Sequence, residues 1–201
     1  MNIYTDWLHG TSSSITQWTL AGRGAVKGQT QLHKALFFTT DPFFAKFSGG
    51  QSPTVYMANL LPGAHVLDIS DPGVTCSRED SEQLRAAVAG MRPGKGNILC
   101  EYPYNWNKGW RTGEVMKYAP RPGDQMMAYL AHMAINFRDT SEGMQAWNTV
   151  QMITRQCIED IVDGAIKVGY QAVAGHEQQD GVTYPILIVL DPAILTPPIK
   201  I

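Results

Sequence analysis

Two segments decide the fold. The first is Leu8-His9-Gly10-Thr11-Ser12, and the second is Ala35-Leu36-Phe37-Phe38-Thr39-Thr40-Asp41-Pro42-Phe43-Phe44-Ala45-Lys46-Phe47. The first ends an apolar strand expected over Ile3 to Leu8, and its glycine lets a ligand approach the backbone closely. The hydroxyls of Thr11 and Ser12 suit a helix cap or a bound ribose. Taken alone, this segment is explained more simply as the end of a strand, followed by a turn and a helix capped by serine.

The second segment changes that balance, because it combines a strand with a helix start. The apolar stretch Ala35 to Phe38 leads into Asp41-Pro42, a capping residue followed by proline at the first helical position. Phe43, Phe44 and Phe47 follow at helical spacing, which predicts that most of them are core. A strand that ends in aromatics before a helix also offers a flat platform for a ring. Together the two segments favour a nucleotide-binding cleft.

These segments, with TVYMANLLPGAHVLDIS (residues 54–70) and YPILIVLDPAIL (residues 184–195), resemble the ADP-ribosyltransferase superfamily. The likeness is greater to its diphtheria-toxin and poly(ADP-ribose)-polymerase branch. The resemblance implies an α+β fold with a split two-sheet core and an NAD cleft. It also implies a mono-ADP-ribosyltransferase, working as a toxin, effector or phage-defence enzyme, that cleaves NAD at the nicotinamide bond and transfers ADP-ribose to a macromolecule.

The resemblance assigns roles to individual residues. His9 matches the histidine that holds the adenosine-side ribose of NAD, and Gly10 the glycine whose backbone pairs with the nicotinamide amide. Phe37 and Phe47 fall at or near the two nicotinamide-stacking positions, with the phenolic hydroxyl lost. The expected cofactor-binding set is His9, Gly10, Thr11, Ser12, Phe37, Phe38, Phe47 and Ile186.

The third motif of the family is altered, because Ile186 stands where the family has its catalytic glutamate. That carboxylate stabilises an oxocarbenium-like state and positions a ribose hydroxyl. Isoleucine there is compatible with transfer of single units and argues against chain elongation. The substitute we expect is Glu177, in a loop over residues 176–180 before the terminal strand, which makes Glu177, His9 and Phe37 the expected catalytic residues. The plainer alternative is that this loop is polar because it is solvated.

Length and pattern predict one domain over residues 1–201. With 201 residues and 44% hydrophobic content the chain can bury one sizeable core. Helices are expected over Ser81 to Met91, Asp124 to Asn136 and Ser141 to Val168, inside a helical or irregular insertion at about 75–168. Arg92 to Gly123 is expected to be a long irregular segment. Further strands are expected at residues 54–60, 66–68, 172–174 and 186–190.

The charge and the cysteine content limit the classes of partner and the cellular setting that we expect. A net charge of -2 and a pI near 6.2 give no global case for nucleic acid. Basic residues among the aromatics of residues 95–121 leave RNA or DNA open beside protein as the acceptor. Three well-separated cysteines favour a reduced, cytoplasmic setting without a structural metal. We expect no membrane association, and an antitoxin or immunity protein as a possible partner.

Two alternatives to the transferase remain open from the sequence. The loss of the third-motif glutamate, with phenylalanine in place of tyrosine, allows a catalytically silent NAD- or target-binding module with the same fold. An NAD glycohydrolase, in which water is the acceptor, is the other.

Overall fold

The computed structural model describes residues 1–20, 34–50, 53–119 and 121–201. Within these ranges the strands are β1 (Trp7–Thr11), β2 (Leu36–Thr39), β3 (Thr54–Ala58), β4 (Val66–Asp68), β5 (Ala172–Gln179), β6 (Val182–Val189) and β7 (Ile199–Lys200). The α-helices are α1 (Pro42–Ser48), α2 (Arg78–Ala89), α3 (Pro103–Thr112), α4 (Gln125–Asn136) and α5 (Ser141–Lys167). Short 3-10 helices are η1 (Ile98–Glu101), η2 (Glu114–Met116) and η3 (Pro192–Ile194).

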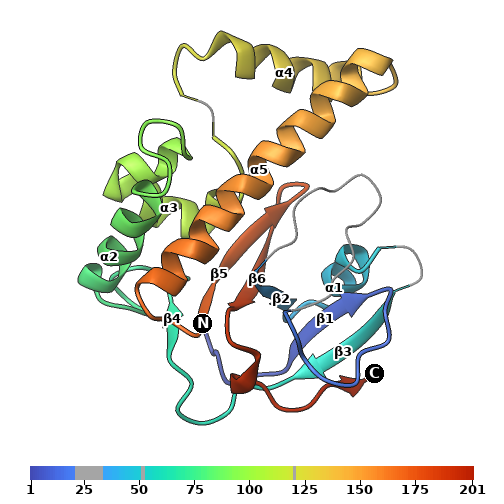
Figure 1. Ribbon diagram of the computed structural model, residues 1–201, viewed down its shortest axis with the longest axis vertical. Helices are drawn as coiled ribbons and strands as arrows, with labels where there is room; N and C mark the ends of the chain where they lie inside the picture. The colour runs from blue at the N-terminus through green and yellow to red at the C-terminus, as the bar shows by residue number, and fades with distance from the viewer. Residues whose placement is uncertain (21–33, 51–52, 120) are drawn as a thin grey trace.

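The α+β class is confirmed, and the strands form one sheet in the order β4-β5-β6-β2-β1-β3-β7 (Figure 1). Neighbouring strands are antiparallel except β4 and β5. Between β1 and β2 the register holds a single partner pair, Leu8 with Thr39. We call this pair the joint. The expectation of two separate sheets is therefore corrected: the halves β4-β5-β6-β2 and β1-β3-β7 diverge on either side of the joint but stay connected through it.

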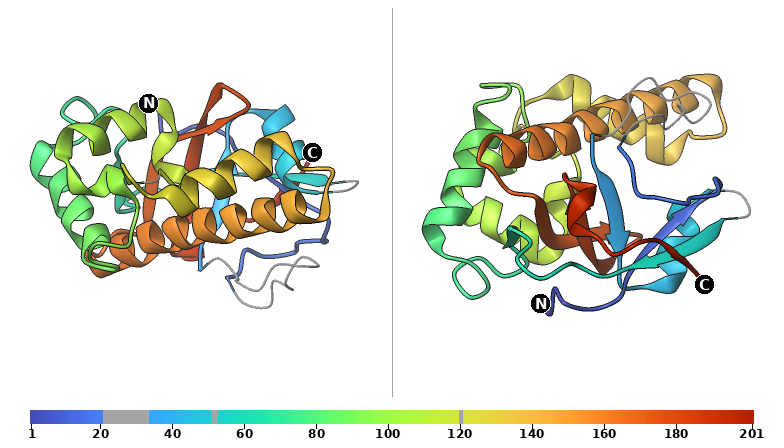
Figure 2. Two further views of the ribbon diagram at one scale, coloured as in Figure 1. Left: turned by 90° about the horizontal axis from the view of Figure 1, so that it is seen from above. Right: turned by 60° about the horizontal axis from the view of Figure 1, so that its bottom comes forward.

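The core lies on both faces of the sheet. One face packs against α2, α3 and α5, through Leu84, Trp110 and Ile161 among others. The other face buries Phe38 and Leu187 beneath the segment around η3. Figure 2 shows α2 and α3 at one end of the molecule and α1 at the other, beside β1 and β3, with α5 running along its length. The joint therefore lies between the end of the molecule that holds α1 and the end that holds α2 and α3.

The helix boundaries follow from local chemistry. Asp41 caps α1, its Oδ1 accepting from the Phe44 amide at 2.7 Å, and Pro42 occupies the first turn as expected. Thr140 caps α5, whose end at Lys167 is followed by Gly169 with a φ of 88°. The predicted cap at Asp41 is confirmed. Helix α2 begins three residues earlier than expected, because Ser77 caps it.

Three expectations of local structure are wrong. Strand β1 begins at Trp7, because the Trp7 indole donates to the Ile3 carbonyl at 2.8 Å and holds the preceding residues in a turn. The irregular segment expected over residues 92–123 contains helix α3, which buries Trp106 and Trp110 one turn apart. Residues 176–179 are strand, not loop: they pair with residues 182–185, and the turn is made by Asp180 and Gly181, both at positive φ.

Candidate functional site

His9 links the two sequence motifs across the joint. Its Nδ1 lies 2.7 Å from the carbonyl oxygen of Phe37, and the side chain is buried. A carbonyl oxygen only accepts, so Nδ1 carries the proton and donates. In the neutral ring Nε2 is then an acceptor, the chemistry to which a ribose hydroxyl donates. The structure thus brings the His9 side chain and the Phe37 backbone together, while their roles toward NAD stay predictions.

An aromatic cluster surrounds His9 that the sequence analysis missed. Trp18 meets the His9 ring edge-on at 5.8 Å and the Phe38 ring at 5.0 Å, and its indole donates to the Thr196 carbonyl at 2.8 Å. Tyr56 stands opposite His9 in β3. Its hydroxyl accepts from the Ile15 amide at 3.1 Å, and this contact, with the Ser14 side chain, lowers the pKa of Tyr56. Tyr56 could have been found by pairing the two predicted strands β1 and β3, which places it opposite His9. No feature of the sequence around Trp18 indicates that it contacts His9.

Gly10 has a packing role of its own. An added Cβ would lie 1.7 Å from the carbonyl oxygen of Ala45 in α1, and one on Gly49 would lie 2.7 Å from the Gly10 carbonyl carbon. Only glycine allows the backbones of β1 and α1 to approach this closely. Its expected contact with the nicotinamide amide stays a prediction.

Thr11 and Ser12 lie at the end of β1. Thr11 is half-buried and its hydroxyl accepts from the Ser13 amide at 3.1 Å, whereas Ser12 is exposed. In the described residues 12–20 no helix begins, so the alternative of a serine-capped helix is wrong. Both residues therefore follow His9 at the C-terminal end of β1.

The expected nicotinamide platform is only partly assembled. Phe37 is half-buried on the helix-covered face of the sheet, and Phe38 is buried on the other face. Of the α1 aromatics only Phe44 is core; Phe43 and Phe47 are 73% and 60% exposed, so the expectation that most are buried is wrong. Helix α1 is short and packs through one narrow side, which explains the exposure. Phe37 packs against the core on the helix-covered face, whereas the Phe47 ring is on an exposed side of α1.

Phe44 stacks on Tyr184 of β6, with ring centroids 4.4 Å apart and planes 6° from parallel. Tyr184 pairs with Glu177 in β5, and Ile186 pairs with Gly175. Because alternate residues share a face, all four lie on one face, and Glu177 is diagonal to Ile186 at roughly 7 Å between Cα atoms. Glu177 is half-buried. The Glu177 carboxylate therefore lies on a residue one diagonal step from Ile186, the position at which the resemblance leads us to expect a glutamate.

Ile186 itself is 1% exposed and packs in the core with Trp110. Its side chain contacts this core and not an open cleft. Gly175, its partner, is closed from the same side, since an added Cβ would lie 2.4 Å from the Trp110 ring.

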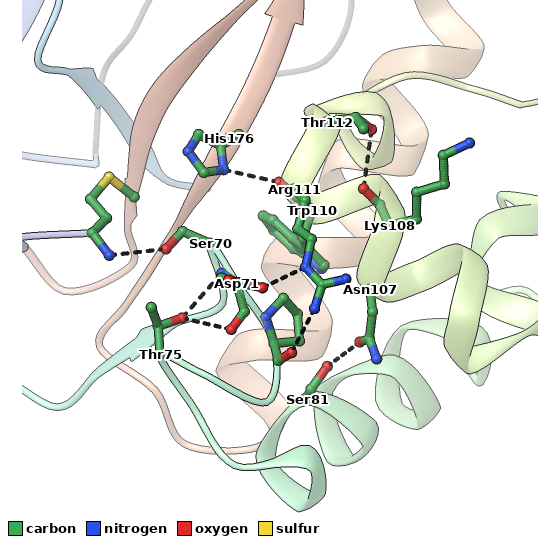
Figure 3. A network of polar contacts seen from close by, with 12 residues as sticks. Ser70, Asp71, Thr75, Ser81, Asn107, Lys108, Trp110, Arg111, Thr112 and His176 are labelled. Atoms are coloured by element: carbon green, nitrogen blue, oxygen red, sulfur yellow. Dashed lines mark hydrogen bonds and ion pairs between the residues drawn. The ribbon is translucent and has the colours of Figure 1, made fainter.

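Helix α3 holds the strand that carries Glu177 (Figure 3). His176 Nδ1 lies 3.1 Å from the Trp110 carbonyl oxygen, and Arg111 forms an ion pair with Asp71. Gly113, at a φ of 79°, lies against the backbone of Glu177 and Gln178, where a Cβ would come within 2.4 Å. The middle of the chain thus positions β5, a role that its sequence did not reveal.

Two cavities lie away from these residues. One of about 90 Å³ lies between α2, η1 and α5 and is lined by Arg92, Asp160, Cys100 and Cys157. One of about 500 Å³ lies at the β4 edge and is lined by Asp68, Cys76, Asp80 and Tyr170. Burial, with the nearby Asp80 carboxylate, raises the pKa of Tyr170 to about 12. None of the expected NAD-binding residues lines either cavity.

All three cysteines are free thiols. Among the described residues no group of three or more histidine, cysteine or acidic side chains is arranged to hold a metal ion. In the same residues no helix is both long and apolar enough to cross a bilayer.

No protein family, no curated protein and no solved structure matches the chain.

Proposed function

We propose that the protein is a mono-ADP-ribosyltransferase that binds NAD across the joint between the two halves of the sheet. The observation that carries the proposal is the contact of 2.7 Å between His9 Nδ1 and the Phe37 carbonyl. It ties together the two motifs of the resemblance at a place where the sheet holds one partner pair. Beyond this pair β1 and β2 leave backbone groups without a partner in the neighbouring strand, and a ligand can use such groups.

In this proposal the residues near the joint divide the substrate between them. His9 accepts from a hydroxyl of the adenosine-side ribose, assisted by Ser12. Gly10 offers its backbone to the nicotinamide amide, and Phe37 with the exposed ring of Phe47 flanks the nicotinamide. Phe43 and Phe47 are one helical turn apart on α1, so the helix presents an exposed aromatic surface.

The chemistry needs a negative charge close to the bond that breaks. The bond between the ribose C1′ and the nicotinamide nitrogen breaks, and the nitrogen keeps the electron pair. A nucleophile on the target then bonds to C1′ and loses its proton. Glu177, diagonal to Ile186, stabilises the positive charge that develops on the ribose. Its strand is fixed by α3, so the carboxylate has a defined position.

A second candidate is a binding module of the same fold without transfer. It is favoured by Ile186, which is buried where the family has its glutamate. A module of this kind would bind NAD and leave it intact.

The test is incubation of the purified chain with adenylate-labelled NAD and a cell lysate, with protease-treated and nuclease-treated samples. We expect label on a macromolecule, and loss of label to one treatment then gives the acceptor class. His9→Ala should abolish labelling. His132→Ala, an exposed histidine on α4, is the matched control and should not change it.

Glu177→Gln separates the two candidates. If Glu177 supplies the charge, this variant should lose about 100-fold or more of the transfer rate while NAD binding is kept. Wild-type protein that binds NAD without releasing nicotinamide would instead support the silent module. Nicotinamide release without label on any macromolecule would identify a glycohydrolase. A folded wild type that does not bind NAD would refute the proposal.

A further inference from the structure

Helix α4 projects from the body of the protein, with α5 as its main packing partner (Figure 1). Met127 and Ala134 are its buried residues and face α5. Other apolar side chains are exposed, among them Met126 at 67% and Tyr129 at 57%. A single-layer helical arm with large exposed side chains is typical of an interaction surface.

The apolar side chains form a stripe along α4. The exposed Met126 and Tyr129 and the half-buried Met133 follow one another at intervals of three and four residues, and the exposed, polar Asn136 continues the stripe after three more. This spacing marks one side of a helix, away from the side that packs on α5. We call Met126, Tyr129, Met133 and Asn136 the α4 stripe.

The intervals of the α4 stripe are the same in both directions along the helix. If a second copy of α4 packs on it antiparallel, Tyr129 of each copy therefore faces Met133 of the other. Thioether sulfur against an aromatic ring is a favourable contact. Met126 of each copy faces the end of the other helix, where Phe137 is 45% exposed. A surface that is complementary to itself is what a two-fold dimer needs.

Charge supports the same partner. Residues Gln125 to Asn136 contain no Asp, Glu, Lys or Arg, so a two-fold contact brings no charge against its own copy. Beyond the ends of α4, the antiparallel arrangement brings Arg138 to the level of Asp124 of the second copy. Membrane surfaces and nucleic acids select basic faces, which α4 does not have.

We propose that two copies of the chain associate through their α4 stripes, antiparallel about a two-fold axis near Ala131. The contact is one helix pair, so the interface is small and the dimer is in exchange with monomer. The proposal does not depend on the transferase function, since the α4 stripe includes none of the residues expected to bind NAD.

Sedimentation equilibrium of the full chain tests the proposal. The wild type should show a concentration-dependent monomer and dimer. Tyr129→Glu and Met133→Lys should each weaken dimerisation about 10-fold or more, because each places a charge against an apolar side chain. Ile135→Glu is the matched control: Ile135 is 75% exposed on another side of the same helix, and the variant should dimerise like the wild type.

Mixing the two variants gives the decisive result. In an antiparallel pair one chain with Tyr129→Glu and one with Met133→Lys place opposite charges together and keep one native Tyr129–Met133 contact, so association should return in the mixture. A wild type that is monomeric up to about 1 mM overturns the proposal. So does a dimer that Tyr129→Glu leaves intact, or a mixture in which association is not restored. Circular dichroism checks that each variant retains its helices.

Discussion

Gly10 and Gly49 decide how closely helix α1 approaches strand β1. At this distance the Ala45 carbonyl oxygen occupies the space of any side chain at position 10. The resemblance assigns Gly10 a contact with a ligand, but the packing of α1 on β1 already requires glycine at this position. The two roles are compatible, because the close approach of α1 involves the side of Gly10 on which a Cβ would lie and leaves its backbone groups in β1.

Gly10→Ala should therefore destabilise the fold by about 3 kcal/mol, whatever the protein binds, because one backbone must move to make room. Gly96→Ala is the control, since a Cβ there meets its nearest neighbour at 3.5 Å, an ordinary contact. Urea unfolding measures both. Equal stability of the two variants would show that α1 shifts without cost.

Single residues near the joint were partly predictable. His9 and Phe37 come together because both lie on strands that the apolar pattern identifies. Trp18 was not predictable, since it reaches His9 from a segment without periodicity and its indole donates to Thr196, far along the chain. Such contacts depend on how the chain returns and leave no local signal.

At the scale of elements, helix α5 is anchored by two ion pairs of different kinds. Arg92 contacts Asp160 at 2.7 Å, and the Asp160 side chain is 7% exposed. Lys34 contacts Asp163 at 2.8 Å with a side chain that is 62% exposed, and this contact raises the pKa of Lys34. In the first pair the carboxylate is shielded from water, whereas both side chains of the second pair are exposed.

Arg92→Met should cost about 3 kcal/mol, because it leaves the Asp160 carboxylate buried without its cation. Lys34→Met should change stability by less than about 1 kcal/mol. Thermal unfolding of the two variants measures the contrast. Similar losses in both would mean that water reaches Asp160 once Arg92 is removed.

The sequence predicted α4 and α5 but not α3. The first two have long apolar periodicity and capping residues at Asp124 and Thr140. Helix α3 is ten residues long between a proline and a left-handed glycine, and its two buried tryptophans were attributed to a loop. Glycine and proline marked the ends of this helix, not its absence.

At the scale of the whole molecule, stability should depend on pH above neutrality. Burial raises the pKa of the Cys100 thiol from 9.0 to about 12 and that of Cys157 to about 11. The unfolded chain loses these protons first, so it binds fewer protons than the folded chain between about pH 9 and 12. Stability is therefore full below about pH 9 and falls as the pH rises.

Between about pH 8 and pH 10 each buried thiol should remove about 1 kcal/mol from the free energy of unfolding. Urea unfolding at the two pH values measures the slope. Cys157→Ala should reduce the slope by the share of that thiol, although it also lowers stability at every pH. An unchanged slope would place the titration elsewhere, for example at tyrosines.

The α+β class followed from the strand and helix patterns, but the strand order did not. β6 lies between β5 and β2, and β7 pairs with β3 at the edge. Both pairings join distant parts of the chain. Local patterns identify which residues form strands and do not specify their neighbours.

The interleaved strand order has a consequence for synthesis on the ribosome. β1 and β3 belong to one half of the sheet, whereas β2, between them in the sequence, belongs to the other. Leu36 in β2 pairs with Val189, and Tyr56 in β3 pairs with Lys200. β1 and β3 can pair as soon as both have been made, whereas β2 stays unpaired on the side of β6 until residues 182–189 have been synthesised. The sheet is therefore expected to form only after β6 has been synthesised, with an apolar early strand β2 that needs protection while the helices are being made.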